Sequence, residues 1–213
     1  MLLNLTPAEL IARMVVLVIA FTFHEFSHAF VANYFGDDTP RSQGRLTLNP
    51  LVHLDPMGSL LLLVAGFSWA KPVQVNPYVL ERSNRWAPLL VALAGPLSNF
   101  ILAVLASLPV RFGLIAFSGP GQYFPTAFQL IDEFVLINLL LMLFNLIPLS
   151  PLDGEKVLTY LLPASGQQFM DTIRPYGPMI LLGLIFLLPL AGINILSAII
   201  LKPMQALYAA LLG

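Results

Sequence analysis

The sequence contains no cysteine, and this absence limits the sites that it can build. Without cysteine, the chain can form neither a disulfide nor a zinc site with thiolate ligands. A bound metal must therefore take its ligands from histidine, aspartate, glutamate or asparagine. Histidine is itself scarce, so the positions of the three histidines are informative: His24, His28 and His53.

Charged residues are also scarce. They make up 10% of the 213 residues, whereas soluble domains contain about 25%. The net charge of −1 leaves no general basic surface, so we expect no nucleic-acid partner. Hydrophobic residues reach 58%, more apolar surface than a soluble fold of this length can bury. We therefore expect an all-α polytopic membrane protein in a lipid bilayer, organised as a single domain over residues 1–213.

Four apolar runs are long enough to cross a bilayer, for which about 20 helical residues suffice. They lie at residues 9–35, 86–112, 127–148 and 178–201, and a short apolar tail follows. Thr6, Pro7 and Glu9 predict the start of the first helix, with a threonine cap, a proline at the first helical position and a glutamate one turn later. Shorter apolar segments bring the expected total to about four to six transmembrane helices.

Two segments after the first span predict something other than a spanning helix. Residues 44–49 alternate between apolar and polar side chains before a proline, which is typical of a strand, and we expect a short membrane-associated β-hairpin there. Residues 60–69 are apolar but too few to cross, so we expect a re-entrant or interfacial segment. Irregular backbone at membrane depth is stable only inside protein or beside a wet cavity, so a strand here would indicate a cavity.

Basic residues predict the orientation, because the cytoplasmic loops of membrane proteins are enriched in lysine and arginine. With four spans, three basic residues fall on one side: Arg13, Arg111 and Lys202. Seven fall on the other: Arg41, Arg45, Lys71, Arg82, Arg85, Lys156 and Arg174. We expect the second side to face the cytoplasm and both termini to lie outside.

The first span contains the strongest chemical signal, an H-E-x-x-H motif at residues 24–28. Side chains four residues apart on a helix lie one above the other, so His24 and His28 can bind a single zinc. Glu25 follows directly on the helix and can reach a water molecule that the metal activates. A carboxylate in that position is suited to act as a general base in hydrolysis.

The same motif also occurs by coincidence in soluble helices. Membrane depth argues against coincidence here, because three ionisable groups within one helical turn are costly in lipid and are rarely kept without a role. A hydrolytic zinc site combines three protein ligands with one open position. His53 and Asp153 are the candidates for the third ligand. Asp153 follows two prolines that break the third span, which is typical of functional sites in membrane helices. It has a second interpretation as a helix cap at the cytoplasmic surface, because Gly154, Glu155 and Lys156 follow it.

The order of these motifs resembles the site-2 protease family of intramembrane metalloproteases. The elements that carry the resemblance extend from the first span to Glu155: H-E-x-x-H, then Gly95-Pro96-Leu97-Ser98-Asn99, then Asn145 before Leu152-Asp153-Gly154. Residues 49–56 and 69–73 further resemble a compact prokaryotic branch of the family that lacks PDZ and CBS domains.

The resemblance implies a Zn²⁺ cofactor held by His24, His28 and Asp153, with Glu25 as the catalytic base. It implies that Asn145 stands beside the zinc and steadies the tetrahedral intermediate or the substrate backbone. The implied activity is cleavage of peptide bonds within or near the transmembrane segments of single-span membrane proteins. It would take place near the cytoplasmic face of a prokaryotic cell membrane.

Some interpretations stay open. His53 is a surface-loop histidine, a gate or substrate contact, or a fourth metal ligand. Asn99 is a gate or substrate contact, or a packing residue between helices. For the whole chain, the alternatives are a metal transporter, which would not need Glu25 and usually shows repeated halves, and an inactive relative that keeps the fold. An extended substrate is expected to pair with the strand at 44–49.

Overall fold

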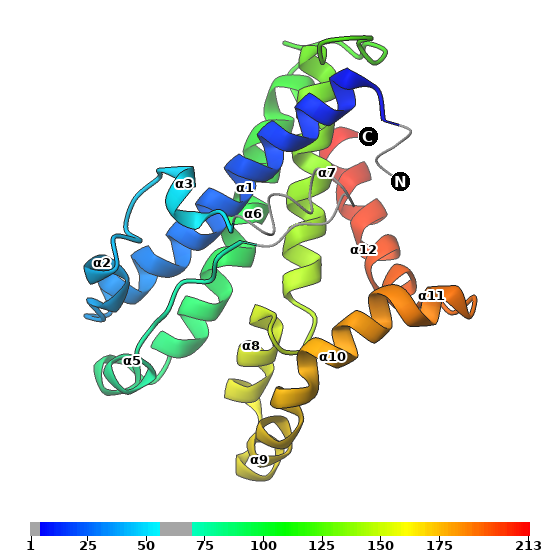
Figure 1. Ribbon diagram of the computed structural model, residues 1–213. Helices are drawn as coiled ribbons and strands as arrows, with labels where there is room; N and C mark the ends of the chain where they lie inside the picture. The colour runs from blue at the N-terminus through cyan, green and yellow to red at the C-terminus, as the bar shows by residue number, and fades with distance from the viewer. Residues whose placement is uncertain (1–4, 56–69) are drawn as a thin grey trace.

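The computed structural model describes residues 5–55 and 70–213, and within them the protein is helical. Five helices are long and apolar enough to cross a membrane: Pro7–Tyr34 (α1), Ala87–Arg111 (α6), Ala127–Asn145 (α7), Ala164–Leu190 and Ile195–Leu212 (α12). Helices α1, α6 and α7 pack on one another, and α12 packs on α6 and α7 (Figure 1). The expectation of an all-α, multi-pass membrane protein is confirmed.

Short helices complete the described part of the chain. Between α1 and α6 lie Thr39–Ser42 (α2), Pro50–His53 (α3) and Pro77–Ser83 (α5). Asp153–Leu161 (α8) follows α7. The fourth apolar segment consists of consecutive helical pieces: Ala164–Ile173 (α9), Arg174–Tyr176 (η2), Gly177–Leu182 (α10), Gly183–Leu187 (η3, a π-helix) and Leu188–Leu190 (α11).

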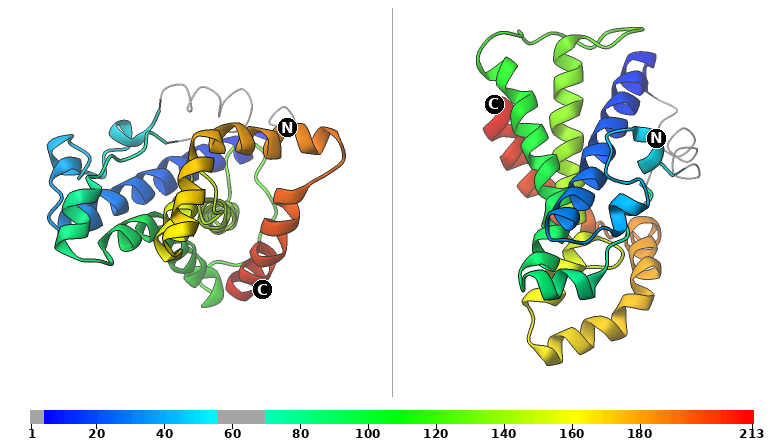
Figure 2. Two further views of the ribbon diagram at one scale, coloured as in Figure 1. Left: turned by 90° about the horizontal axis from the view of Figure 1, so that it is seen from below. Right: turned by 90° about the vertical axis from the view of Figure 1, so that its left-hand side faces the viewer.

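The start of α1 and the end of α12 lie at the same end of the bundle. Arg13, near the start of α1, forms an ion pair of 3.1 Å with Glu133 near the start of α7. Arg111, the last residue of α6, donates a hydrogen bond to the carbonyl of Ala210 in the last turn of α12. Helix α12 therefore ends beside the last turn of α6 (Figure 2).

Local interactions explain where helix α1 begins and ends. Thr6 and Glu9 form a reciprocal capping box, in which the backbone N–H of each residue donates to the side chain of the other at 2.7 and 3.2 Å. The helix ends at Tyr34, and Gly36, two residues later, has a φ of 86° that is readily adopted only by glycine. The predicted helix start is confirmed.

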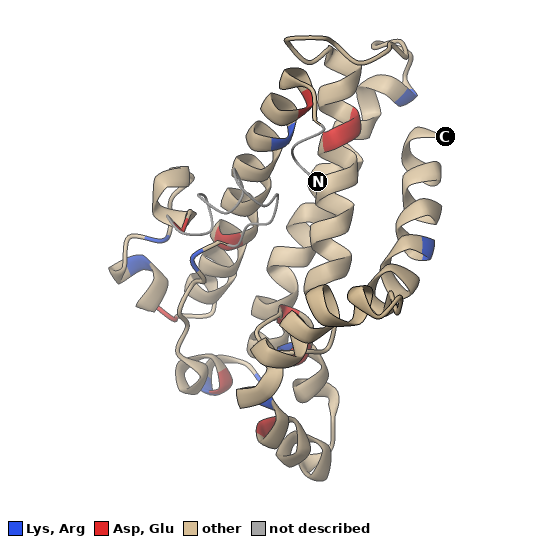
Figure 3. Ribbon diagram, turned by 45° about the vertical axis from the view of Figure 1, so that its right-hand side comes forward, with Lys and Arg blue, Asp and Glu red and all other residues tan. Residues whose placement is uncertain are grey.

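Helix α6 shows how the bundle divides its surfaces between lipid and protein. Large apolar side chains four residues apart point outward, and Leu97, Ile101 and Leu105 are each about half exposed. Small or polar residues face inward and are buried: Ala92, Gly95, Asn99, Ala103 and Ser107. Most charged residues lie toward the ends of the helices or in the connections, leaving long apolar stretches between them (Figure 3). This arrangement is expected where lipid surrounds the bundle.

The expected fourth span at 178–201 is wrong in its boundaries. The helix stops at Leu190, and a new one starts at Ile195. Gly192, with φ of 79°, forms the turn between them, and the preceding Pro189 has no N–H with which to extend a helix. The apolar run is continuous in sequence, so hydropathy alone does not locate this turn.

The β-hairpin expected at 44–49 is also wrong, because these residues form turns and irregular backbone. Buried Arg45 donates to the carbonyls of Val52 and Lys71 at 2.8 and 3.1 Å. These bonds fold the segment onto α3 instead of pairing it with another strand. Within the described residues, the one β-bridge joins Leu54 to Ala70. The re-entrant segment predicted at 60–69 lies outside the described residues.

The connection from α7 to α8 is closely packed at Gly154. A Cβ atom on Gly154 would lie 2.3 Å from the carbonyl oxygen of Leu146 and 2.5 Å from that of Ile147. These are backbone atoms and cannot swing aside, so only glycine fits. This contact fixes the first turn of α8 against the end of α7.

We predict that Gly154→Ala lowers thermal stability, because overpacking against backbone costs about 1–3 kcal/mol. The matched control is Gly183→Ala, since a Cβ at Gly183 meets nothing within 4 Å. Melting of both variants in the same detergent measures the difference. Equal melting temperatures for the two variants would contradict the tight packing.

Candidate metal centre

One row of buried residues along α1 includes the two histidines of the candidate site. Small residues at four-residue intervals form the first part of this row and are buried: Ala8, Ala12, Val16 and Ala20. His24, His28 and Ala32 continue the same row and are also buried. The small side chains let α6 and α7 approach closely, and the two imidazoles then fill the wider space that follows.

The third component comes from α8, far along the chain. Asp153 is the first residue of this helix and is buried. Its Oδ2 atom lies 3.1 Å from Nε2 of His24 and 3.1 Å from Nε2 of His28. Its other oxygen pairs with Lys156 at 3.2 Å. The cap interpretation is therefore incomplete, since the carboxylate of Asp153 points at both imidazoles.

The carboxyl of Asp153 also contacts the Lys156 ammonium at 3.2 Å, and a cationic partner favours the ionised form of a carboxyl. The site thus offers one anionic oxygen beside two nitrogen ligands. This donor set suits a divalent cation.

A hydrogen bond at Nδ1 of each imidazole determines whether its Nε2 atom, which faces Asp153, carries a proton or a lone pair. Nδ1 of His28 lies 2.7 Å from the carbonyl of Val91, and Nδ1 of His24 lies 2.6 Å from Oδ1 of Asn99. Both partners are acceptors, so both Nδ1 atoms carry the proton and both neutral rings present an Nε2 lone pair. Two lone pairs and a carboxylate oxygen then converge, and a shared cation would neutralise their repulsion.

The geometry fits zinc. The two Nε2 atoms are 3.2 Å apart, and ligand atoms about 2.0–2.1 Å from a tetrahedral zinc lie roughly 3.3 Å from each other. Within the described residues, these side chains form one group of potential metal ligands. Gly95 leaves the necessary space, since a Cβ there would lie 2.4 Å from Nε2 of His28 and 2.5 Å from Nε2 of His24.

Glu25 is buried beside the triad but is not part of it. One of its carboxylate oxygens, Oε2, accepts a hydrogen bond of 2.9 Å from the backbone N–H of Val73. Val73 belongs to the connection that follows residue 70, which the bond between Lys71 N–H and the His53 carbonyl ties to α3 at 2.8 Å. The connection therefore fixes the orientation of the Glu25 carboxylate.

The remaining predicted residues lie outside the triad. Asn145, the last residue of α7, is half-buried, and its amide donates to the carbonyl of Leu141 at 3.0 Å.

His53 is fully buried, so its interpretation as a surface histidine is wrong. Its Nε2 donates to the carbonyl of Thr47 at 2.7 Å, and its Nδ1 has no hydrogen-bond partner among the described residues. Asn99 is also fully buried and contacts His24 from behind.

Sequence reasoning missed three residues around the site. Val73 acts through its backbone, which leaves no signal in the side-chain pattern. Asn138 lies within an apolar span and is fully buried, so its polarity at membrane depth was a usable signal. Glu155 is buried on α8 and accepts bonds of 3.0 and 2.8 Å from Arg174, which ties η2 to the helix that carries Asp153.

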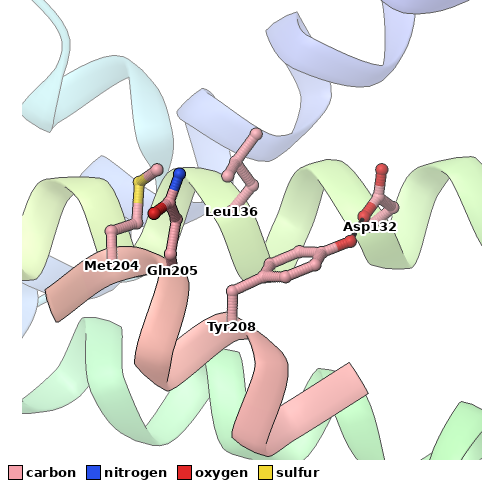
Figure 4. Close-up of a pocket in the computed structure, with 5 residues that line it drawn as sticks. All are labelled: Asp132, Leu136, Met204, Gln205 and Tyr208. Carbon is pink, nitrogen blue, oxygen red and sulfur yellow. Dashed lines mark hydrogen bonds between the residues drawn. The ribbon is translucent and has the colours of Figure 1, made fainter. Parts of the chain in front are cut away.

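A pocket lies apart from this centre, between α7 and α12 (Figure 4). It has a volume of about 170 Å³, and its lining residues are Asp132, Leu136, Met204, Gln205 and Tyr208. The hydroxyl of Tyr208 donates to the carboxylate of Asp132. The pocket shares no lining residue with the candidate metal centre.

Comparison with known proteins identifies similar chains. "Putative zinc metalloprotease YwhC" of Bacillus subtilis is 43% identical over 192 residues, which cover 87% of this chain and 85% of the relative. Rip2 of Mycolicibacterium smegmatis, described in the same words, is 32% identical over 169 residues, or 76% of this chain and 61% of Rip2. MJ0611 of Methanocaldococcus jannaschii, also so described, is 34% identical over 145 residues, or 66% and 65% of the two chains.

The chain spans less than two thirds of the length of Rip2 and MJ0611, but most of YwhC. No family model and no solved structure matches it. The similarity to YwhC covers nearly the whole chain, and the buried triad supplies three residues that could hold a metal. The chain thus belongs to the zinc metalloprotease family of these relatives, with zinc as its cofactor, in agreement with its resemblance to the site-2 proteases.

Proposed function

We propose that the protein is a zinc-dependent intramembrane endopeptidase that hydrolyses peptide bonds within or near the transmembrane segments of other membrane proteins. One observation carries this proposal. The Nε2 atoms of His24 and His28 and Oδ2 of Asp153 converge within 3.2 Å inside a bundle of membrane helices, and Glu25 lies beside them. A centre buried in this way can act on a peptide bond that enters from the bilayer.

His24, His28 and Asp153 would hold the zinc. Three protein ligands leave one coordination position for water or substrate, as hydrolytic zinc sites require. Zinc in this place would supply a Lewis acid that polarises the scissile carbonyl and activates a water molecule. The ring orientations needed for ligation already exist, because both Nδ1 atoms are held by acceptors.

Glu25 would act as the general acid and base. Its carboxylate would accept a proton from the attacking water and later deliver it to the leaving amine. Burial keeps other water away from this exchange, and the Val73 N–H keeps the carboxylate in one orientation. Preorganisation of this kind is favourable because no reorientation is needed during the reaction.

Asn145 would steady the oxyanion or the substrate backbone. Its side-chain amide donates to the Leu141 carbonyl, so it would have to exchange this intrahelical bond for the substrate. An amide donor at the end of α7, one loop away from Asp153, is suited to such an exchange. We also propose His53 as a gate or substrate contact, since its buried Nδ1 is an acceptor to which no described residue donates.

The proposed substrates are single-span membrane proteins, cut near the cytoplasmic face of a prokaryotic cell membrane. Asp153 lies in the connection after α7, next to Lys156. Most of the basic residues belong to this connection and to the one between α1 and α6, which is the distribution of cytoplasmic loops. The centre would therefore meet substrates close to that face.

The test of the proposed function compares wild-type protein with Glu25→Gln in detergent, measuring zinc content and cleavage of a panel of single-span substrates. We expect about one zinc per chain in both, as in sites with three protein ligands. Cleavage should fall by about 10²–10⁴-fold in the variant, which is the range for loss of a general base. Equal cleavage by the two proteins, or no zinc in either, would refute the proposal. Zinc in both with no cleavage of any substrate would favour a transporter.

We predict that Gly95→Ala removes zinc from the protein. The added methyl group would lie within 2.6 Å of the His24 and His28 rings, in the space in front of their ligand atoms. Affinity for zinc, measured by competition with a chelator, should fall about tenfold or more, and cleavage should fall with it. Gly183→Ala is again the control, because it adds a methyl group in open space. Unchanged zinc affinity in Gly95→Ala would place the metal elsewhere.

We predict that Val73→Pro slows cleavage without removing zinc. Proline lacks the N–H that contacts Glu25, whereas Val73→Ala keeps it and is the matched control. A hydrogen bond to a charged group contributes about 1.5–3 kcal/mol, so kcat should fall by roughly tenfold to a hundredfold. The idea fails if alanine and proline variants cleave equally fast, or if zinc is lost together with activity.

A further inference from the structure

We infer that Asn99 and Asn138 form a buried amide relay that holds His24 in the tautomer able to ligate a metal. The inference rests on the proposed zinc site and adds two positioning residues to it. Both side chains are completely buried, Asn99 on α6 and Asn138 on α7. Buried amides in an apolar bundle must find all their partners within the protein, so their bonds can be followed one by one.

The relay starts at a fixed acceptor on α7. The side-chain Nδ2 of Asn138 donates to the backbone carbonyl of Phe134, one turn earlier on the same helix, at 2.9 Å. A carbonyl can only accept, so this bond determines which end of the amide is nitrogen. The oxygen of Asn138 is thereby turned toward α6.

The amide of Asn99 is oriented by Asn138 in the same way, so that its oxygen faces α1. Its Nδ2 donates to Oδ1 of Asn138 at 2.8 Å and also to the carbonyl of Ala20 at 3.3 Å. Both N–H groups of Asn99 are thus engaged with acceptors. Its Oδ1 must then face His24, where it lies 2.6 Å from Nδ1 of the ring.

The orientation of the Asn99 amide determines which ring nitrogen of His24, a proposed metal ligand, carries the proton. An oxygen at this place requires a proton on Nδ1 of His24, so Nε2 of the neutral ring carries the lone pair. If the amide of Asn99 turned over, its NH₂ group would face Nδ1 and move the proton to Nε2. A protonated Nε2 cannot bind zinc.

His28 shows that the relay is specific to one ligand. Nδ1 of His28 donates directly to the backbone carbonyl of Val91 at 2.7 Å, so no side-chain rotation can reverse it. The state of His24 depends instead on two side chains. The structure gives Asn138 no hydrogen bond to His24, and it acts on the ring through Asn99.

Zinc affinity of the full-length protein in detergent tests the relay, by competition with a chelator. The variants are Asn99→Leu, Asn138→Leu and the double variant. Leucine has a similar volume and no polar group, and Asn138→Ala replaces Asn138→Leu if the latter does not fold. The matched control is Ser107→Ala, because Ser107 is also buried on α6 but bonds within its own helix, to Val104 at 2.7 Å. Melting of the metal-free proteins is measured in parallel.

We expect Asn99→Leu to weaken zinc binding about 10–100-fold, as loss of a partner to a ligating histidine does. Asn138→Leu should weaken it several-fold, and the double variant should bind as Asn99→Leu does, because the two residues act in series. Ser107→Ala should bind zinc as the wild type does.

Two results would overturn the relay: unchanged zinc affinity in Asn138→Leu, or a further loss when Asn138→Leu is added to Asn99→Leu. Either leaves the protease proposal intact, since the wild type still binds zinc. Absence of zinc from the wild type would overturn the relay and the proposed function together. Zinc binding and coupling as expected, with no cleavage of any substrate, would support the relay and refute only the protease.

Discussion

Polar groups inside this bundle must be satisfied by other groups of the protein, because the surrounding lipid offers no hydrogen bonds. This constraint explains why the interior polar residues occur in connected sets. Arg45 binds two carbonyls between α3 and the connection after residue 70, and that connection in turn donates to Glu25. Asn138, Asn99 and His24 form a second set across α7, α6 and α1. The metal centre lies where such sets meet, so its geometry depends on three helices and one loop at once.

The triad of His24, His28 and Asp153 differs from the rest of the interior in how its polar atoms are paired. Elsewhere in the described part of the chain, most buried donors and acceptors are paired, with His53 Nδ1 and Glu133 Oε2 as exceptions. At the triad, two lone pairs and one carboxylate oxygen converge, about 3.1–3.2 Å apart. Only positive charge can hold them together, which makes the site selective for a cation by electrostatics alone. Gly95 has no side chain that would fill that point, so space for a cation is kept. The amphipathic division of α6 serves both needs, because its outer face contacts lipid while its inner face supplies Gly95 and Asn99.

Much of this arrangement follows from the sequence, and the exceptions have physical causes. The H-E-x-x-H spacing placed His24 and His28 on one helix face, and long apolar runs located α1, α6 and α7. Asp153 was one of two candidates until the fold brought it to the imidazoles. The expected strand at 44–49 failed because buried side-chain bonds from Arg45 override a two-residue alternation. The partners of Asn99 and Glu25 depend on how helices pack and on a backbone N–H, neither of which is visible in a pattern of residue types.

The separation of the ligands along the chain affects how the protein is made. His24 and His28 enter the membrane with the first helix, but Asp153 follows His28 by 125 positions and is synthesised only after α6 and α7. A nascent chain that stops before α8 has two of the three proposed ligands and lacks the anionic one. It also lacks the Gly154 contact that fixes α8 against α7. If these three residues hold the metal as proposed, a chain that ends before α8 would lack hydrolytic activity, and the activity would arise only after α8 has packed against α7.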